Sequence, residues 1–90
     1  MRRARRYLIA GRVQGVGFRF FAEAAAAREN IHGWVRNLPD GRVEALVEGE
    51  RESVMRVESA LRSGPRGARV EHVVVDDDEP TGEHGDFSIR

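Results

Sequence analysis

The sequence predicts an α+β fold in which two helices cover one face of an antiparallel sheet. Segments of alternating apolar and polar residues predict strands, segments with apolar residues at helical spacing predict two helices, and glycine- or proline-containing turns separate them. Their order is β-α-β-β-α-β with a short C-terminal strand, which is the split βαβ sandwich of ferredoxin-like folds. At 90 residues the chain has room for one domain, spanning residues 1–90.

The first half of the chain is expected to hold a strand, a helix and the start of a hairpin. Residues 6–13 alternate in hydrophobicity, which predicts a strand, and two glycines within residues 14–17 end it. From Phe18 to about Asn30 the chain is rich in alanine and its apolar residues recur at helical spacing, which predicts a helix packed closely on the sheet. Gly33 ends that helix.

The second half is expected to complete the hairpin and to add one helix and two strands. A Leu-Pro-Asp-Gly turn at residues 38–41 joins strands at 34–37 and 42–48. Residues 51–62 have apolar side chains at helical spacing with charges elsewhere, which predicts a helix. The remaining segments are a β-branched strand at 69–75, a polar loop at 76–85 and a short alternating strand at 87–90.

Composition excludes several classes of function. Fifteen arginines balance fifteen acidic residues, so the molecule has no overall field that would attract nucleic acid or an anionic membrane. The chain has no cysteine, which excludes thiolate nucleophiles and zinc–thiolate or iron–sulfur sites, and no lysine, which excludes a Schiff-base lysine. We therefore expect no cofactor, no metal and no nucleic-acid partner.

The opening of the chain is rich in arginine but does not predict export. Four of its first six residues are arginine, and the apolar run that follows is too short for the hydrophobic region of a signal peptide. No stretch approaches the about 20 apolar residues that cross a bilayer. We expect a cytoplasmic protein that has no membrane partner and acts as a monomer.

The turn between the first strand and the first helix is a candidate anion site. Its residues are Gln14, Gly15, Val16, Gly17, Phe18 and Arg19. A glycine turn into a helix start presents backbone N–H groups and the positive end of the helix dipole, and Arg19 is placed to grip two oxygens of the same anion. The glycine spacing matches neither the dinucleotide fingerprint nor Walker A, however, and on spacing alone a connecting turn with a surface arginine is the favoured interpretation.

Asn37 is a second candidate, at the point where a predicted strand gives way to a turn. An asparagine before a Pro-Asp-Gly turn often only binds its own backbone, and this is the strong structural alternative. In the functional interpretation Asn37 holds a water molecule through a neutral amide, without the negative charge that would repel a phosphate.

Both candidates fall within motifs that resemble the two signatures of the acylphosphatase family. Ile-Ala-Gly-Arg-Val-Gln-Gly-Val-Gly-Phe-Arg at 9–19 resembles the first signature, and Gly-Trp-Val-Arg-Asn at 33–37, with Gly41, Val43 and Gly49, resembles the second. The resemblance extends over essentially the whole chain, including its length and its closing Phe-Ser-Ile-Arg. It implies a small free-standing acylphosphatase, which hydrolyses acyl phosphates to a carboxylate and inorganic phosphate.

The resemblance also implies roles for individual residues. Arg19 would bind the substrate phosphate together with the amides of residues 14–18, and Asn37 would orient the water that attacks phosphorus, without a metal. Gly17 stands where some family members carry a bulkier residue. The chain is similar as well to the amino-terminal domain of hydrogenase-maturation carbamoyltransferases, so carbamoyl phosphate is an alternative ligand.

Other features of the sequence are given structural interpretations. The three histidines are too scattered for a metal site. The acidic run at 76–79 is expected to be a solvated loop and not a calcium site, and Trp34 and the phenylalanines are expected in the core. A non-catalytic anion-binding module is a competing function, although it has no use for a water-positioning amide at Asn37. RNA binding is a weaker alternative, because the aromatic pairs that would stack bases are absent.

Overall fold

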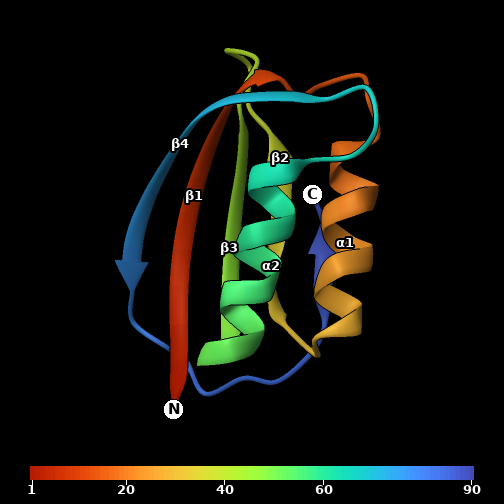
Figure 1. Ribbon diagram of the computed structural model, residues 1–90. Coiled ribbons are helices and arrows are strands. Elements are labelled where there is room, and N and C mark those ends of the chain that lie inside the picture. The colour runs from red at the N-terminus through yellow and green to blue at the C-terminus, as the bar shows by residue number, and fades with distance from the viewer.

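The computed structural model describes residues 1–90 as two helices on one face of a five-stranded sheet (Figure 1). The elements are β1 (Arg2–Arg12), α1 (Phe18–Arg28), β2 (His32–Asn37), β3 (Val43–Glu50), α2 (Arg51–Ser63), β4 (Arg69–Asp78) and β5 (Phe87–Ile89). The four long strands pair antiparallel in the order β4-β1-β3-β2, and β5 adds to the β2 edge in parallel. The predicted fold class is confirmed, and the short C-terminal strand makes the sheet mixed.

The hydrophobic core lies between the two helices and the sheet. On the sheet side, Tyr7, Ile9 and Val35 have no exposed surface, and on the α1 side Ala22 and Ala26 are equally buried. Small alanine side chains let the backbone of α1 approach the sheet closely, as the alanine-rich segment predicts. The close approach fixes the position of α1, and with it the loop that leads into the helix.

The paired edge of β1 and β4 is longer than the sequence predicts. β1 begins at Arg2 and β4 continues to Asp78, so the prediction of a loop at 76–79 is wrong for its first three residues. Ala4–Arg6 pair with Asp76–Asp78 across the ladder, and Arg6 forms an ion pair with Asp78 at 3.3 Å. Opposite charges on neighbouring strands attract, so two segments that look solvated when taken separately form sheet together.

Aromatic side chains divide between the core and the surface. Phe18 is buried as predicted, but Phe20 is 67 % exposed, so the prediction of a core position is wrong for Phe20. Trp34 lies on the sheet face opposite the helices, because its strand neighbour Val35 faces the core. The guanidinium of Arg90 covers the Trp34 ring at 4.7 Å, so Trp34 is a half-buried surface residue and not the predicted core residue.

A buried carboxylate helps to hold the segment between β4 and β5 to the far end of the sheet. Glu48 of β3 is 1 % exposed and accepts hydrogen bonds from the backbone N–H groups of Thr81 at 2.9 Å and Gly82 at 2.8 Å, and it pairs with Arg2 at 3.1 Å. Burial alone would raise the pKa of this carboxyl, but these donors lower it to about 2. Figure 1 shows the segment passing the end of the sheet where the N-terminus lies.

Two further observations concern membrane-spanning helices and metal sites. Neither helix is long and apolar enough to cross a membrane. Among residues 1–90 no three histidine, aspartate or glutamate side chains gather in a geometry that would hold a metal ion. The partly buried histidine, His32, instead bonds the backbone oxygen of Gly85 at 2.8 Å and lies 2.7 Å from Glu83.

Candidate active site

The loop from β1 to α1 turns sharply through left-handed backbone. Gly15 has φ 74° and Gly17 has φ 76°, a region that side chains with a Cβ rarely adopt, although no atom lies within 4 Å of either missing Cβ. Backbone conformation and not lack of space therefore requires glycine at both positions. Gly17 caps α1 without a side-chain hydrogen bond, so the first amides of the helix are left to bind an anion.

A small cavity of about 100 Å³ lies where this loop meets the end of β2. Its lining residues are Val13, Gln14, Gly15, Gly17, Phe18, Arg19, Phe20 and Asn37. All the predicted site residues are therefore brought together except Val16, which packs against the core. This is several times the roughly 10–15 Å³ that one water molecule needs, so the cavity has room for a small group such as a phosphate.

Arg19 is the one partly buried arginine that forms no ion pair with an aspartate or glutamate side chain. Eight of the fifteen arginines pair with an acidic side chain, and six of the other seven are exposed. Arg19 makes a single long hydrogen bond, from its Nη1 to the backbone oxygen of Arg90 at 3.4 Å. A partly buried guanidinium with most of its donors unused is suited to bind an anion.

Asn37 ends β2 and its side-chain amide forms no hydrogen bond within residues 1–90. The turn that follows is stabilised by other groups: Leu38 and Arg42 pair through their backbones at 2.8 Å, and Asp40 accepts from the Arg42 N–H at 3.1 Å. The interpretation of Asn37 as a turn residue that bonds its own backbone is therefore not what the structure shows. A half-buried amide faces the cavity with its donor and acceptor free.

Gln14 connects the loop to the hairpin. Its side-chain Nε2 donates to the backbone oxygens of Leu38 at 2.8 Å and Arg42 at 3.0 Å. These bonds fix the distance between the loop and the turn next to Asn37. The side-chain nitrogen of Gln14 is thus engaged by the protein, a role that depends on where the hairpin folds and that the sequence did not indicate.

The charges around the cavity have one sign. No aspartate, glutamate or histidine lines it, and Arg19 is its one ionised side chain.

Two residues that line the cavity, Val13 and Phe20, were not predicted as site residues. Val13 shares the strand alternation of residues 6–13, and Phe20 directly follows Arg19 in the first motif, so the signal for both was adjacency to the predicted loop.

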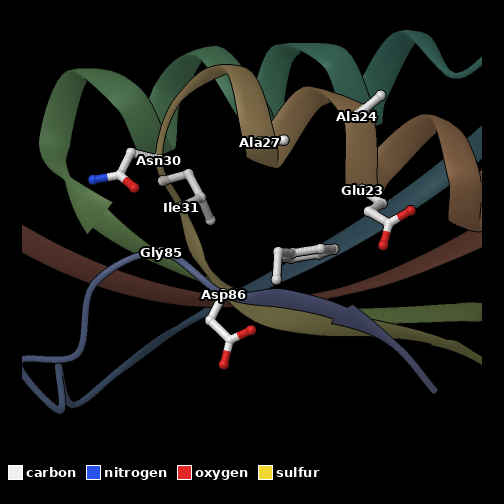
Figure 2. A pocket seen from close by; sticks show the side chains of 8 residues that line it. Glu23, Ala24, Ala27, Asn30, Ile31, Gly85 and Asp86 are labelled. Carbon is white, nitrogen blue, oxygen red and sulfur yellow. The ribbon is translucent and has the colours of Figure 1, made fainter.

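A second, larger cavity of about 430 Å³ has the opposite character (Figure 2). It lies between the second half of α1 and the segment that enters β5, and Figure 2 shows Glu23, Ala24 and Ala27 on the helix above Gly85 and Asp86. Two carboxylates and no arginine line it. An anionic ligand is therefore expected at the smaller cavity and not here.

Comparison with known proteins agrees with the motifs. A family model described as Acylphosphatase matches residues 5–89. An acylphosphatase of Roseiflexus sp. is 56% identical over 90% of this chain and 87% of its own length. The crystal structure of acylphosphatase from Bacillus subtilis is 37% identical and superposes with a TM-score of 0.92, covering 100% of this chain and 99% of that chain. Full-length HypF is 29% identical with a TM-score of 0.85, and this chain spans 12% of it.

Proposed function

This chain belongs to the acylphosphatase family and hydrolyses acyl phosphates, and we propose that it does so by attack of water on phosphorus, with Arg19 and Asn37 as the catalytic residues. The water oxygen forms a bond to phosphorus while the bond from phosphorus to the acyl oxygen breaks. The carboxylate leaves with the electron pair, and inorganic phosphate is the second product. The observation that carries the proposal is that one small cavity is lined by Asn37, whose amide forms no hydrogen bond within the protein, and by Arg19, whose guanidinium forms a single long one.

Arg19 is proposed to bind the phosphate together with the loop amides. Its guanidinium offers two parallel N–H donors to two phosphate oxygens, and the first amides of α1 add donors and the positive end of the helix dipole. Phosphoryl transfer has a loose transition state with charge on the equatorial oxygens, so positioned donors supply most of the stabilisation. The loop turns through its left-handed glycines directly into the start of α1, where these donors lie.

Asn37 is proposed to orient the attacking water. Its amide oxygen accepts a hydrogen bond from the water and its amide nitrogen donates to a phosphate oxygen, which aligns the nucleophile with phosphorus. A carboxylate in this place would repel the substrate. Gln14 supports the arrangement by holding the turn beside Asn37 to the loop.

The proton of the water is proposed to pass to a phosphate oxygen of the substrate. No histidine or carboxylate lines the cavity to act as a base, and the same lack of ligand groups favours catalysis without a metal. A carboxylate is already a good leaving group, so a strong base is not required. We expect the enzyme to act without nucleic acid, in keeping with its balanced charge. We also expect it to be a cytoplasmic monomer.

The proposal is tested by following benzoyl phosphate hydrolysis by ultraviolet absorbance in the presence of a chelator. We expect wild-type activity to persist in chelator, and Arg19→Gln and Asn37→Ala each to lower kcat/KM by about a hundredfold or more. Arg28→Gln, an exposed and unpaired arginine on the same helix, is the matched control and should keep the wild-type rate.

Circular dichroism of each variant establishes that a loss of rate is not a loss of fold. Folded variants at positions 19 and 37 that keep the wild-type rate would contradict the proposed roles. An inert wild type that still binds inorganic phosphate would identify a non-catalytic anion-binding module instead.

A further inference from the structure

The small cavity holds the phosphate of an acyl phosphate but has no room for a large acyl group. Its volume is about 100 Å³, less than a quarter of that of the larger cavity. With the phosphate against Arg19 and the loop amides, the acyl group must extend across the rim of the cavity. The side chains at this rim therefore meet the part of the substrate that differs from one acyl phosphate to another.

Phe20 is the exposed large apolar residue among those that line the cavity. Four large hydrophobic residues of the chain are exposed, Met1, Phe20, Met55 and Val74, and of these Phe20 alone lines the cavity. It is 67 % exposed and does not belong to the core cluster. The aromatic contact near the helix start joins Phe18 to Phe21, at 6.2 Å between ring centres, and leaves Phe20 out. Phe20 thus lines the same cavity as Arg19 and has most of its surface uncovered.

We propose that Phe20 contacts the acyl group of the bound substrate and gives the enzyme a preference for aromatic and long-chain acyl phosphates over acetyl phosphate. The inference rests on the proposed phosphate position in the small cavity. An exposed ring and an apolar acyl group lose water-accessible surface when they meet, and two aromatic rings gain additional attraction from their geometry. A methyl group covers too little of the ring to gain much.

The contact is expected to act on substrate binding. The acyl group is present in both the ground state and the transition state, so a contact with its apolar part stabilises both alike. Phe20→Ala should therefore raise KM for benzoyl phosphate and leave kcat nearly unchanged. A change that distorted the loop or Arg19 would lower kcat for every substrate, which separates the two explanations.

The test compares kcat/KM for acetyl, hexanoyl and benzoyl phosphate, because the ratio between substrates cancels effects on the shared phosphate site. Phe20→Ala should lower the benzoyl-to-acetyl ratio by about three- to tenfold. Phe20→Leu should keep the hexanoyl-to-acetyl ratio near wild type while lowering the benzoyl ratio. Met55→Ala, which removes an exposed apolar side chain on α2 away from the cavity, should leave both ratios unchanged.

Each outcome decides the inference. The inference is supported if the benzoyl-to-acetyl and hexanoyl-to-acetyl ratios of kcat/KM change with the side chain at position 20 as described. Ratios that stay at the wild-type value in Phe20→Ala, with all three substrates still hydrolysed, overturn the acyl contact and leave the proposed function standing. A wild type that hydrolyses none of the three overturns both.

Discussion

The two cavities at opposite ends of α1 differ in charge, and the smaller one carries the chemistry for a phosphate. The cavity at the start of α1 measures about 100 Å³ and holds Arg19 and no acidic side chain. The cavity at the end of α1 measures about 430 Å³ and holds Glu23 and Asp86 and no basic one. Volume alone would favour the larger cavity, whereas the sign of the charge favours the smaller one for an anionic substrate.

The direction of α1 adds to this difference in charge between the two cavities. Its N-terminal amides and positive dipole end face the small cavity, and its carbonyl end lies toward the large one. The partly buried charged side chains that form no ion pair are also divided by sign between the two cavities. Six of the fifteen acidic residues form no ion pair, and Glu23 is the only one of the six that is partly buried. Arg19 has the same standing among the arginines that form no ion pair with an acidic side chain. One helix thus separates an anion-attracting end from an anion-repelling end.

The largest expected effect comes from giving the small cavity the charge of the large one. Asn37→Asp places a carboxylate beside the phosphate, and we expect kcat/KM for benzoyl phosphate to fall by about a thousandfold at pH 7, since water orientation is lost and the substrate is repelled. The loss should shrink as pH falls toward the ordinary carboxyl pKa of about 4. The measurement is the ratio of variant to wild-type rate between pH 4 and pH 8.

Asp86→Asn is the matched control for this change. It alters charge by one unit in the large cavity and should leave the rate within about twofold of wild type, because screening weakens interactions across the molecule. A large loss in Asp86→Asn, or a rate near wild type in Asn37→Asp, would break the distinction between the two cavities.

A smaller effect is expected on stability, from Glu48 at the end of the sheet near the large cavity. The Glu48 pKa of about 2 lies below its ordinary value near 4.5, so the carboxylate contributes stability that is complete above about pH 4.5 and is lost as pH falls toward 2. The pKa shift corresponds to about 3 kcal/mol. Because Glu48 holds the segment that leads to Asp86, Glu48→Gln should loosen the large cavity and spare the small one.

Denaturant unfolding between pH 2 and pH 7 measures this effect. We expect the wild type to lose about 3 kcal/mol over the acid range and Glu48→Gln to show a flatter profile with lower stability at pH 7. Its kcat at pH 7 should match the wild type. An unchanged pH profile, or a lost kcat in a folded variant, would contradict the structural role assigned to Glu48.

The fold could be predicted largely because its signals are local. Alternation, helical spacing and glycine turns each lie within one segment, and the order of elements follows from them. The ends of β1 and β4 could not be found this way. Arg6 and Asp78 are far apart in the sequence, and each looks like a solvated charge until the strands pair.

The candidate site also has a part that local sequence signals predict and a part that depends on the folded structure. Arg19 and Asn37 could be named because they fall within motifs. What makes them suited to a phosphate is that, in a partly buried place, Asn37 has no side-chain partner and Arg19 has only one distant one, and this depends on the folded arrangement of other residues. The same holds for Gln14, whose partners belong to a distant turn, and for Phe20, whose exposure the helical pattern did not reveal.

The most direct test of the account is to locate bound inorganic phosphate by amide chemical shifts of the 15N-labelled protein. The account predicts saturable shifts in the amides of Gly15, Gly17 and Arg19, none beyond the background at Asn30 and Asp86, and greatly weakened binding in Arg19→Gln. Shifts centred on Asn30 and Asp86, or phosphate binding of equal affinity in Arg19→Gln, would contradict the placement of the substrate phosphate in the small cavity.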